Sequence, residues 1–169
     1  KAMMPKLEEN HMPCSVIVCG FFGDTGKGKI ISYLALKDKV AVTARAGVGP
    51  NAGHTVLYKG KEYKLRMLPS AFVNEKCRLL IGPGVLINPE VLLREIELTQ
   101  SEGRVGVDPK CAIIEARHIE ADKRGQLAEQ IKTTGTGTGP CNAERALRTV
   151  KLARDLSELQ KYLADVPLE

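Results

Sequence analysis

Four glycines and two lysines crowd the eleven residues from Gly20 to Ile30, GFFGDTGKGKI. Counted from Gly23, this stretch spells G-x-x-x-x-G-K, with Gly28 and Lys29 in the last two places. Glycines let backbone N–H groups approach phosphate oxygens, a helix start favours anions, and lysines add positive charge. The stretch therefore favours phosphate binding, and a glycine-rich turn that carries surface lysines is the alternative.

The residue after Lys29 bears on how a metal would be held. A standard phosphate-binding loop has Ser or Thr at this point, and its hydroxyl binds Mg²⁺. Here the residue is Ile30, which cannot ligate a metal. Mg²⁺ prefers a carboxylate together with phosphate oxygens, and Asp24 is the only carboxylate inside the loop. Asp24 is therefore the candidate metal ligand.

Two further glycine-rich loops carry candidate side chains. The second, residues 46–55 (AGVGPNAGHT), contains Asn51 and His54, and a histidine among glycines is either catalytic or a capping or solvated side chain. The third, residues 133–140 (TTGTGTGP), either grips a second phosphate at the following helix or is only a flexible connector. The local sequence leaves both alternatives open.

The elements between these loops alternate between strand and helix patterns. The β-branched run from Ser15 to Cys19 predicts a strand buried on both faces, and helical spacing follows from about Gly28 to Lys37. Further apolar runs predict strands at 40–45, 78–81, 105–107 and 111–114, and a hairpin is expected around Lys59-Gly60-Lys61. Helices are expected from Asn88 as N-cap to Gly103, from 118 to 132 and from about 143 to 164. This order predicts an α/β fold with a P-loop-NTPase-like central, mostly parallel β-sheet flanked by helices.

Length and composition are those of one α/β domain. Residues 1–12 are read as a tag or N-terminal extension, and residues 13–169 as a nucleotide-binding α/β domain. The net charge of +5 is scattered, which argues against a nucleic-acid partner, and no run approaches the roughly 20 apolar residues of a membrane span. Five cysteines without a C-x-x-C spacing argue against zinc and disulfides, and they fit a reducing, cytoplasmic location.

Taken together, FFGDTGKGK, NAGHT and TTGTGTGP resemble adenylosuccinate synthetase, in order and with compatible spacing. That family has Q-W-G-D-E-G-K-G-K, N-A-G-H-T and T-T-G-x-G-x-G-P. RMLPSAFVN and LLIGPGVLINPEVLLREI also resemble the intervening segments, and the short spacing resembles the archaeal form. The resemblance runs from about Pro13 to the C-terminus.

The resemblance implies a cytoplasmic, homodimeric ligase that joins IMP to L-aspartate at the expense of GTP, through 6-phosphoryl-IMP, with one Mg²⁺ per subunit. Asp24 would be the general base and His54 would lie between the GTP γ-phosphate and the purine O6. Asp24 and the carbonyl of Gly53 would bind the metal. The implied GTP-binding residues are Gly23, Thr25, Gly26, Lys27, Gly28, Lys29, Gly53, His54 and Thr55. The implied IMP-binding residues are Asp24, Asn51, Thr134 and Arg148, with Arg148 reaching the site of the partner protomer.

The sequence departs from the family pattern in two respects. Phe21, Phe22 and Thr25 stand where the family has Gln, Trp and Glu, which removes an acidic neighbour of Asp24. The chain also stops at Glu169, so the family's C-terminal half, with its aspartate-binding and guanine-reading segments, is expected to be missing. The alternatives are a purine-nucleotide-binding module without turnover, a related ligase that acts on a variant purine nucleotide, and a basic RNA- or DNA-binding domain.

Overall fold

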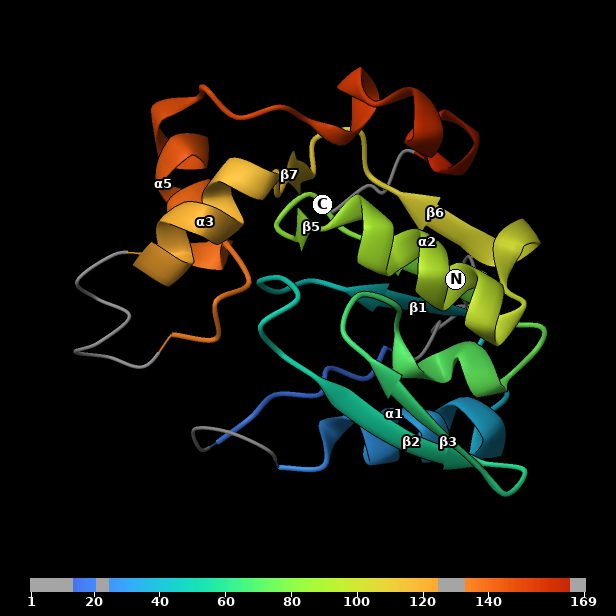
Figure 1. The fold of residues 1–169 in the computed structure, drawn as a ribbon. Coiled ribbons are helices and arrows are strands. Elements are labelled where there is room, and N and C mark those ends of the chain that lie inside the picture. Colours follow the sequence, from blue (N-terminus) through green and yellow to red (C-terminus); the bar gives the residue numbers. More distant parts are fainter. Residues whose placement is uncertain (1–13, 21–24, 125–132, 165–169) are drawn as a thin grey trace, which may run out of the picture.

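The computed structural model describes residues 14–20, 25–124 and 133–164 (Figure 1). The α-helices are α1 (Lys27–Lys37), α2 (Pro89–Thr99), α3 (Ala116–Arg124) and α5 (Thr138–Leu147). The strands are β1 (Val42–Arg45), β2 (His54–Tyr58), β3 (Lys61–Leu65), β4 (Arg78–Ile81), β5 (Leu86–Ile87), β6 (Val105–Val107) and β7 (Ala112–Ile113). Short 3-10 helices are η1 (Ser70–Val73), η2 (Glu102–Arg104), η3 (Ala153–Asp155) and η4 (Ser157–Tyr162).

Parallel pairing organises the sheet, which confirms the predicted α/β class. The order in the main sheet is β1-β4-β6, with Val42 opposite Arg78 and Leu79 opposite Val105. A second, two-stranded sheet pairs β5 with β7, also in parallel. Parallel strands need crossover connections, and they end at the same edge of the sheet. The loop after β1 therefore leaves from that carboxyl edge.

The predicted hairpin is confirmed. Strands β2 and β3 pair antiparallel, and Tyr58 lies opposite Lys61 across the turn. Both turn residues, Lys59 (φ 50°) and Gly60 (φ 75°), have positive φ, as a two-residue turn of type I′ requires. The hairpin places His54 at the first position of β2, at the end remote from the turn.

Local sequence signals explain where the two longest helices begin. Gly26 precedes α1 in the left-handed conformation (φ 75°), and its carbonyl accepts from the amides of Lys29 and Ile30. Asn88 is the N-cap of α2, since its side chain accepts from the Val91 amide, and Pro89 fills the first turn. Helix α2 ends at Thr99, earlier than predicted, because Gln100 turns left-handed (φ 52°).

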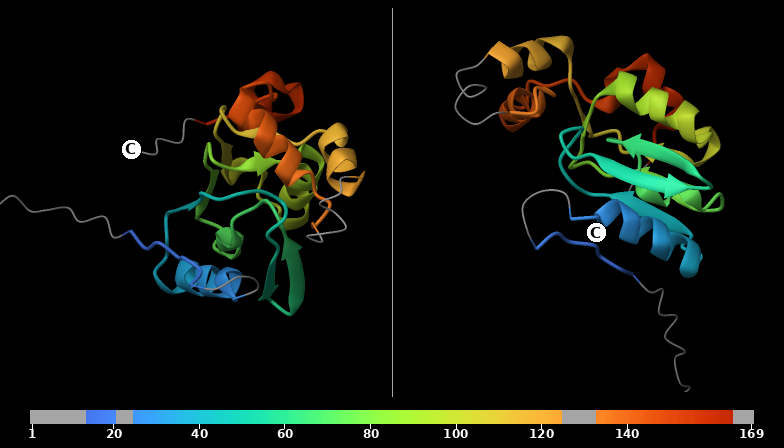
Figure 2. Two further views of the ribbon diagram at one scale, coloured as in Figure 1. Left: turned by 90° about the vertical axis from the view of Figure 1, so that its left-hand side faces the viewer. Right: turned by 60° about the horizontal axis from the view of Figure 1, so that its bottom comes forward.

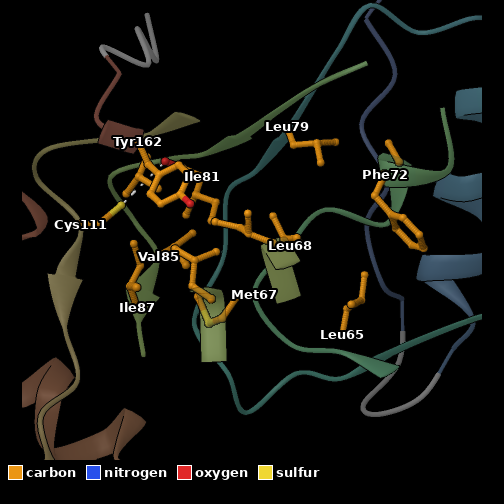
Figure 3. Close-up of a cluster of buried hydrophobic side chains, with 14 of the residues drawn as sticks. Leu65, Met67, Leu68, Phe72, Leu79, Ile81, Val85, Ile87, Cys111 and Tyr162 are labelled. Carbon is orange, nitrogen blue, oxygen red and sulfur yellow. Dashed lines mark hydrogen bonds between the residues drawn. The ribbon is translucent and has the colours of Figure 1, made fainter. Parts of the chain in front are cut away.

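The main core lies between the parallel sheet, the hairpin and α2 (Figure 3). Its largest fully buried members are aliphatic, and Phe72 of η1 contributes the ring that contacts Tyr63 at a centroid distance of 4.8 Å. A smaller cluster of Leu86, Ala112, Ile114 and Cys141 lies under α3 and α5. These two helices lie side by side, away from α1 (Figures 1 and 2). The residues that the structure describes therefore form one principal core and one minor core.

Two predicted elements are wrong. Residues 15–19 form no strand: Val16 and Val18 are 77% and 83% exposed, because the segment pairs with no described strand and its β-branched side chains lack a surface to pack on. The final helix does not run from 143 to 164. It ends at Leu147, because Arg148 adopts a left-handed conformation (φ 61°), and the apolar residues beyond it pack through 3-10 turns and isolated bridges.

Three of the five cysteines, Cys77, Cys111 and Cys141, are buried thiols, and Cys14 is exposed. Burial raises the pKa of Cys111 to about 12 and that of Cys141 to about 11, so both stay protonated and pack as small apolar groups. Within the described ranges, no helix has the length and apolar character to cross a bilayer. The predicted residues 1–12 extension and the 125–132 part of the third predicted helix lie outside the described residues.

Candidate functional site

A pocket of about 360 Å³ lies where the first and second glycine-rich loops meet. The start of α1 provides one wall, and the start of β2 provides the other. The lining residues are Gly26, Gly28, Lys29, Gly53, His54 and Thr55. Backbone amides at a helix start, a lysine and a histidine thus surround one cavity, which is a suitable set of groups for an anionic ligand.

Gly28 allows the two walls to approach closely. A Cβ atom built on Gly28 would lie 3.0 Å from Ser70 Oγ and 3.1 Å from His54 Cβ. Contacts this short are tighter than ordinary van der Waals contacts, so any side chain at this position would push His54 or Ser70 away. The absence of a side chain at Gly28 is what lets β2 lie against α1.

Arg45, which was not a predicted site residue, holds the second loop together. It stands at the last position of β1, and its guanidinium donates to the carbonyls of Gly49 (3.0 Å) and Ala52 (3.3 Å). It also lies 2.9 Å from Nε2 of His54. Burial lowers the pKa of Arg45, and the negative charge of Glu95 opposes that shift. The sequence feature that could have indicated this role is an arginine at the carboxyl end of a predicted strand, directly before a glycine-rich loop.

The third loop is held by a buried carboxylate. Asp122 of α3 accepts a 2.8 Å hydrogen bond from the Gly137 amide, and Gly137 is left-handed (φ 78°) directly before α5. The hydroxyls of Thr134, Thr136 and Thr138 follow one another at 3.0 Å spacings. The loop therefore presents a row of three threonine hydroxyls, and the hydrogen bond between Asp122 and Gly137 holds its backbone in place.

The second and third loops meet at the carboxyl edge of the sheet. A Cβ atom built on Gly49 would lie 3.6 Å from Thr138 Oγ1, and Arg145 of α5 donates to the carbonyl of Gly84 at 3.0 Å. Three segments far apart in the sequence are thus neighbours around one face of the domain.

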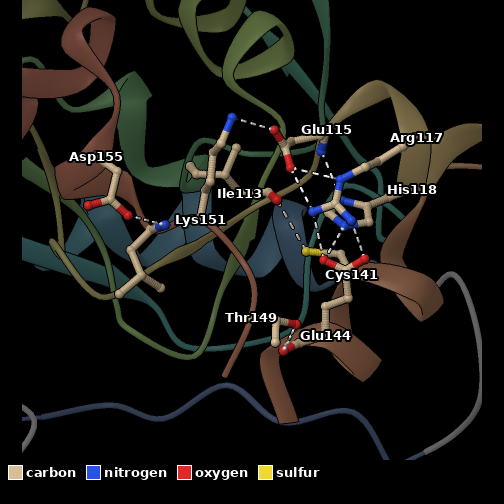
Figure 4. Close-up of polar contacts among 10 residues, drawn as sticks. Ile113, Glu115, Arg117, His118, Cys141, Glu144, Thr149, Lys151 and Asp155 are labelled. Atoms are coloured by element: carbon tan, nitrogen blue, oxygen red, sulfur yellow. Dashed lines mark hydrogen bonds and ion pairs between the residues drawn. The ribbon is translucent and has the colours of Figure 1, made fainter. Parts of the chain in front are cut away.

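An ionic network joins α3 to α5 beside the third loop (Figure 4). Arg117 donates to Glu144 (2.7 Å) and Glu115 (2.8 Å), and Lys151 lies 2.8 Å from Glu115. Hydrogen bonds from Arg117 and then His118 lower the pKa of Glu144, and those from Lys151 and then Arg117 lower the pKa of Glu115. Both carboxylates are therefore ionised at neutral pH and fix α5 in place.

Replacing Gly137 by Ala should destabilise the protein by about 2–4 kcal/mol. The new Cβ would lie 2.9 Å from the Ile119 amide nitrogen in a left-handed residue. Thermal or urea unfolding measures the loss. Gly139→Ala is the matched control, because its Cβ would meet nothing within 4 Å and the helical position should gain up to about 1 kcal/mol. Equal effects of the two substitutions would contradict this account of the loop.

The structure brings together some of the predicted site residues and not others. Thr25 and Lys27 lie beside the pocket, where the lysine donates to the threonine hydroxyl at 3.2 Å. Asn51 is exposed in the second loop, Thr134 is exposed in the third loop before the start of α5, and Arg148 is exposed at the C-cap of α5. Gly23 and Asp24, with Phe21 and Phe22, lie outside the described residues.

The described part of the chain contains no cluster of three or more His, Cys, Asp or Glu side chains that could hold a metal ion. Zinc-type sites are built from such clusters.

These features define a class: α/β domains in which a glycine-rich loop opens a helix beside the carboxyl edge of a parallel sheet. Within that class, the family model for adenylosuccinate synthetase matches residues 16–166. The chain therefore belongs to the adenylosuccinate synthetase family.

Similar proteins agree with this assignment. The chain is 55% identical over 159 residues to the adenylosuccinate synthetase of Archaeoglobus fulgidus, covering 94% of this chain and 47% of that protein. It is 52% identical to the one of Methanococcus vannielii, covering 92% and 47%. The chain thus spans about half the length of the curated relatives it matches.

Two solved structures are similar to this fold. Fully ligated adenylosuccinate synthetase from Plasmodium falciparum has a TM-score of 0.70 at 31% identity, covering 78% of this chain and 32% of that one. A cyanophage S-2L succinoaminodeoxyadenylate synthetase, bound to dGMP and to dATP as an energy donor, has a TM-score of 0.71 at 26% identity, covering 85% and 42%.

Proposed function

We propose that this chain is the GTP- and IMP-binding half of a ligase that joins IMP to L-aspartate, giving adenylosuccinate, GDP and phosphate. The observation that carries the proposal is the pocket at the start of α1, where Gly26, Gly28 and Lys29 face His54 and Thr55. Family membership supports the identity of the substrates.

In this reaction the purine oxygen must become a good leaving group before the aspartate amine can displace it. The GTP γ-phosphate would lie against the amides at the start of α1 and the Lys29 ammonium, which together stabilise its charge. His54 would donate a hydrogen bond to the oxygens of the transferring phosphoryl group. Asp24 would take the proton from the purine N1, a general-base role that is worth about 10²–10⁴-fold in rate.

Asp24 and Gly53 are the residues that would hold Mg²⁺, one ion per subunit. The pocket fits such an ion, because Gly53 brings backbone next to Lys29 and the start of α1, and Mg²⁺ takes few protein ligands when phosphate is present. The ion would neutralise charge on the phosphates during transfer.

IMP would lie between the second and third loops, against Asn51 and Thr134. Arg148 would bind the IMP phosphate of a partner protomer in a homodimer. Its exposed position at the end of α5 supports a role toward another chain, and a guanidinium suits phosphate. A reducing compartment such as the cytoplasm suits the buried thiols.

Binding of Mg·GTP to the chain tests the first part of this proposal. Lys29→Ala should weaken binding about 10-fold or more, since it removes a charge from the pocket. Lys37→Ala, at the other end of α1, should leave the affinity unchanged. Isothermal titration calorimetry measures both. Equal affinity of the wild type and the Lys29 variant would contradict the placement of the triphosphate.

The ligase reaction is tested by fusing the chain to the second half of the Archaeoglobus fulgidus relative. The fusion should form more than one equivalent of GDP per active site only when both IMP and aspartate are present, because phosphorylation of IMP releases GDP once and aspartate is needed to complete the turnover. The rate should fall to background with Asp24→Ala. An equal rate of GDP formation with and without IMP would contradict the proposal.

A ligase for a variant purine nucleotide is the second candidate. Thr25 stands where the family pattern has Glu, and the likeness to the cyanophage enzyme favours this alternative. The same fusion, assayed with dGMP in place of IMP, separates the two candidates by which nucleotide supports GDP formation.

A further inference from the structure

The guanidinium of Arg45 makes four hydrogen bonds among the described residues, and all of them fall on the second loop. Its guanidinium donates to the carbonyls of Gly47 (3.4 Å), Gly49 (3.0 Å) and Ala52 (3.3 Å), and it lies 2.9 Å from His54 Nε2. A guanidinium carries donors and no acceptor. The fourth contact therefore has one possible direction: Arg45 donates and His54 Nε2 accepts.

An imidazole whose Nε2 accepts a hydrogen bond carries its proton on Nδ1. That nitrogen is on the side of α1, since a Cβ atom built on Gly28 would lie 3.4 Å from it. We infer that Arg45 is a positioning residue that fixes His54 in the Nδ1–H tautomer and turns this N–H toward the start of helix α1. Its use by a phosphate rests on the proposed function, but the tautomer itself does not.

The charges around this pair agree with the arrangement. Glu95 is the buried carboxylate that offsets Arg45, and Lys29 lines the same pocket as His54. The wall of the pocket at His54 consequently presents a donor, next to the backbone amides of α1. The His54 N–H, the Lys29 ammonium and the amides at the start of α1 are all donors, and this set suits an anionic oxygen.

His118 provides an internal reference, because its hydrogen-bond partners place the proton on Nε2 instead of Nδ1. The Glu115 amide donates to its Nδ1 at 2.9 Å, and its Nε2 lies 3.1 Å from Glu144. Nδ1 is therefore the acceptor and Nε2 carries the proton. The chain has three histidines in all, so the two tautomers can be read from one small set of signals.

Long-range ¹H–¹⁵N correlation spectra of the ¹⁵N-labelled chain test the inference. They should be recorded well above the ordinary histidine pKa of about 6.5. His11→Asn and His54→Asn assign the signals. His54 should show a protonated Nδ1 and an unprotonated Nε2, and His118 should show the reverse. A protonated Nε2 on His54 in the unaltered chain would overturn the inference without any variant.

Arg45→Met then tests the cause. Methionine keeps much of the length and removes every donor, so the two His54 nitrogens should lose their difference and approach an average of both tautomers. Arg45→Lys, with one point-like donor group, should restore part of the difference. Arg66→Met, whose side chain is exposed on the neighbouring segment, is the control and should change nothing.

The His118 pattern reports whether the Arg45 variant has kept its fold. An unchanged His54 tautomer beside an unchanged His118 pattern would overturn the role of Arg45. If Arg45→Met loses the His118 pattern, the variant has not kept its fold. The inference is then tested by the spectra of the unaltered chain and of Arg45→Lys. Failure to bind Mg·GTP would contradict the proposed function and leave the tautomer result standing, so the two failures are distinguishable.

Discussion

Replacing Glu95 by Ala should lower the free energy of unfolding by about 4 kcal/mol, a large part of the stability of a domain this size. Glu95 is 3% exposed, and its carboxylate accepts from the amides of Arg66 (2.6 Å), Met67 (2.9 Å) and Leu68 (2.9 Å). Alanine would leave these three donors with no acceptor in the protein interior. It would also remove the negative charge that offsets Arg45. Urea unfolding followed by circular dichroism measures the change.

Glu97→Ala is the matched control for Glu95. Glu97 lies on the same helix, α2, but is exposed, so its loss should change stability by no more than about 0.5 kcal/mol. The free energy of unfolding of Glu95→Gln should lie between those of Glu95→Ala and Glu97→Ala, because the amide keeps one oxygen acceptor but places an NH₂ group against the backbone donors. A Glu95→Ala protein as stable as the Glu97→Ala protein would contradict the role of this carboxylate.

Gly28→Ala should weaken binding of Mg·GTP by at least about 10-fold, equivalent to 1.4 kcal/mol. The added methyl group would lie 3.0 Å from Ser70 Oγ and 3.1 Å from His54 Cβ, so these side chains must shift and the wall of the pocket at His54 must change shape. Helical backbone at Gly28 accepts alanine, so the loss comes from packing at the site. Calorimetry of Mg·GTP binding, with unfolding measured in parallel, separates affinity from stability.

Gly47→Ala serves as the control for Gly28. Gly47 also belongs to a glycine-rich loop of the site, but a Cβ atom there meets nothing within 4 Å, so the affinity should change little. If Gly28→Ala bound Mg·GTP as tightly as Gly47→Ala, the close contact between α1 and His54 would have no part in the site.

Much of the fold was predictable because its signals are local. The hairpin follows from Lys59-Gly60, the start of α2 from Asn88-Pro89, and β4 and β6 from short apolar runs with the same bounds as in the structure. Ser15–Cys19 was wrong because β propensity describes how a side chain fits a pleated surface, and that surface depends on the rest of the chain.

The last predicted helix failed for a different reason. The apolar residues after Arg148 have a nearly helical spacing, but Ala153, Leu159 and Tyr162 are buried in the main core from 3-10 turns. A period in the sequence cannot separate these arrangements over so short a stretch.

Part of the site was visible in the sequence, and part was not. Glycines and lysines at phosphate-binding spacing predicted a group of residues that the structure does bring to one pocket. Arg45 escaped notice because its importance comes from four contacts made by a folded loop, and no spacing in the sequence records them. Asp122 escaped in the same way, since its partner is an amide 15 residues further along the chain.

The minor core under α3 and α5 has a thermodynamic consequence. It holds four of the buried apolar side chains among the described residues, whereas the main core holds most of them. The polar contact between α3 and α5 is a pair of Glu144 with His118 and with Arg117, whose side chain is half exposed, and a hydrogen bond from the Gly137 amide to Asp122. Surface ion pairs add little free energy. We therefore expect the opening of this pair of helices to cost less free energy than unfolding the whole domain, with the TTGTGTGP loop opening as part of the same unit. A ligand that joins this loop to the second loop would spend part of its binding free energy on closing the unit, and it would stabilise the outlying helices more than the sheet.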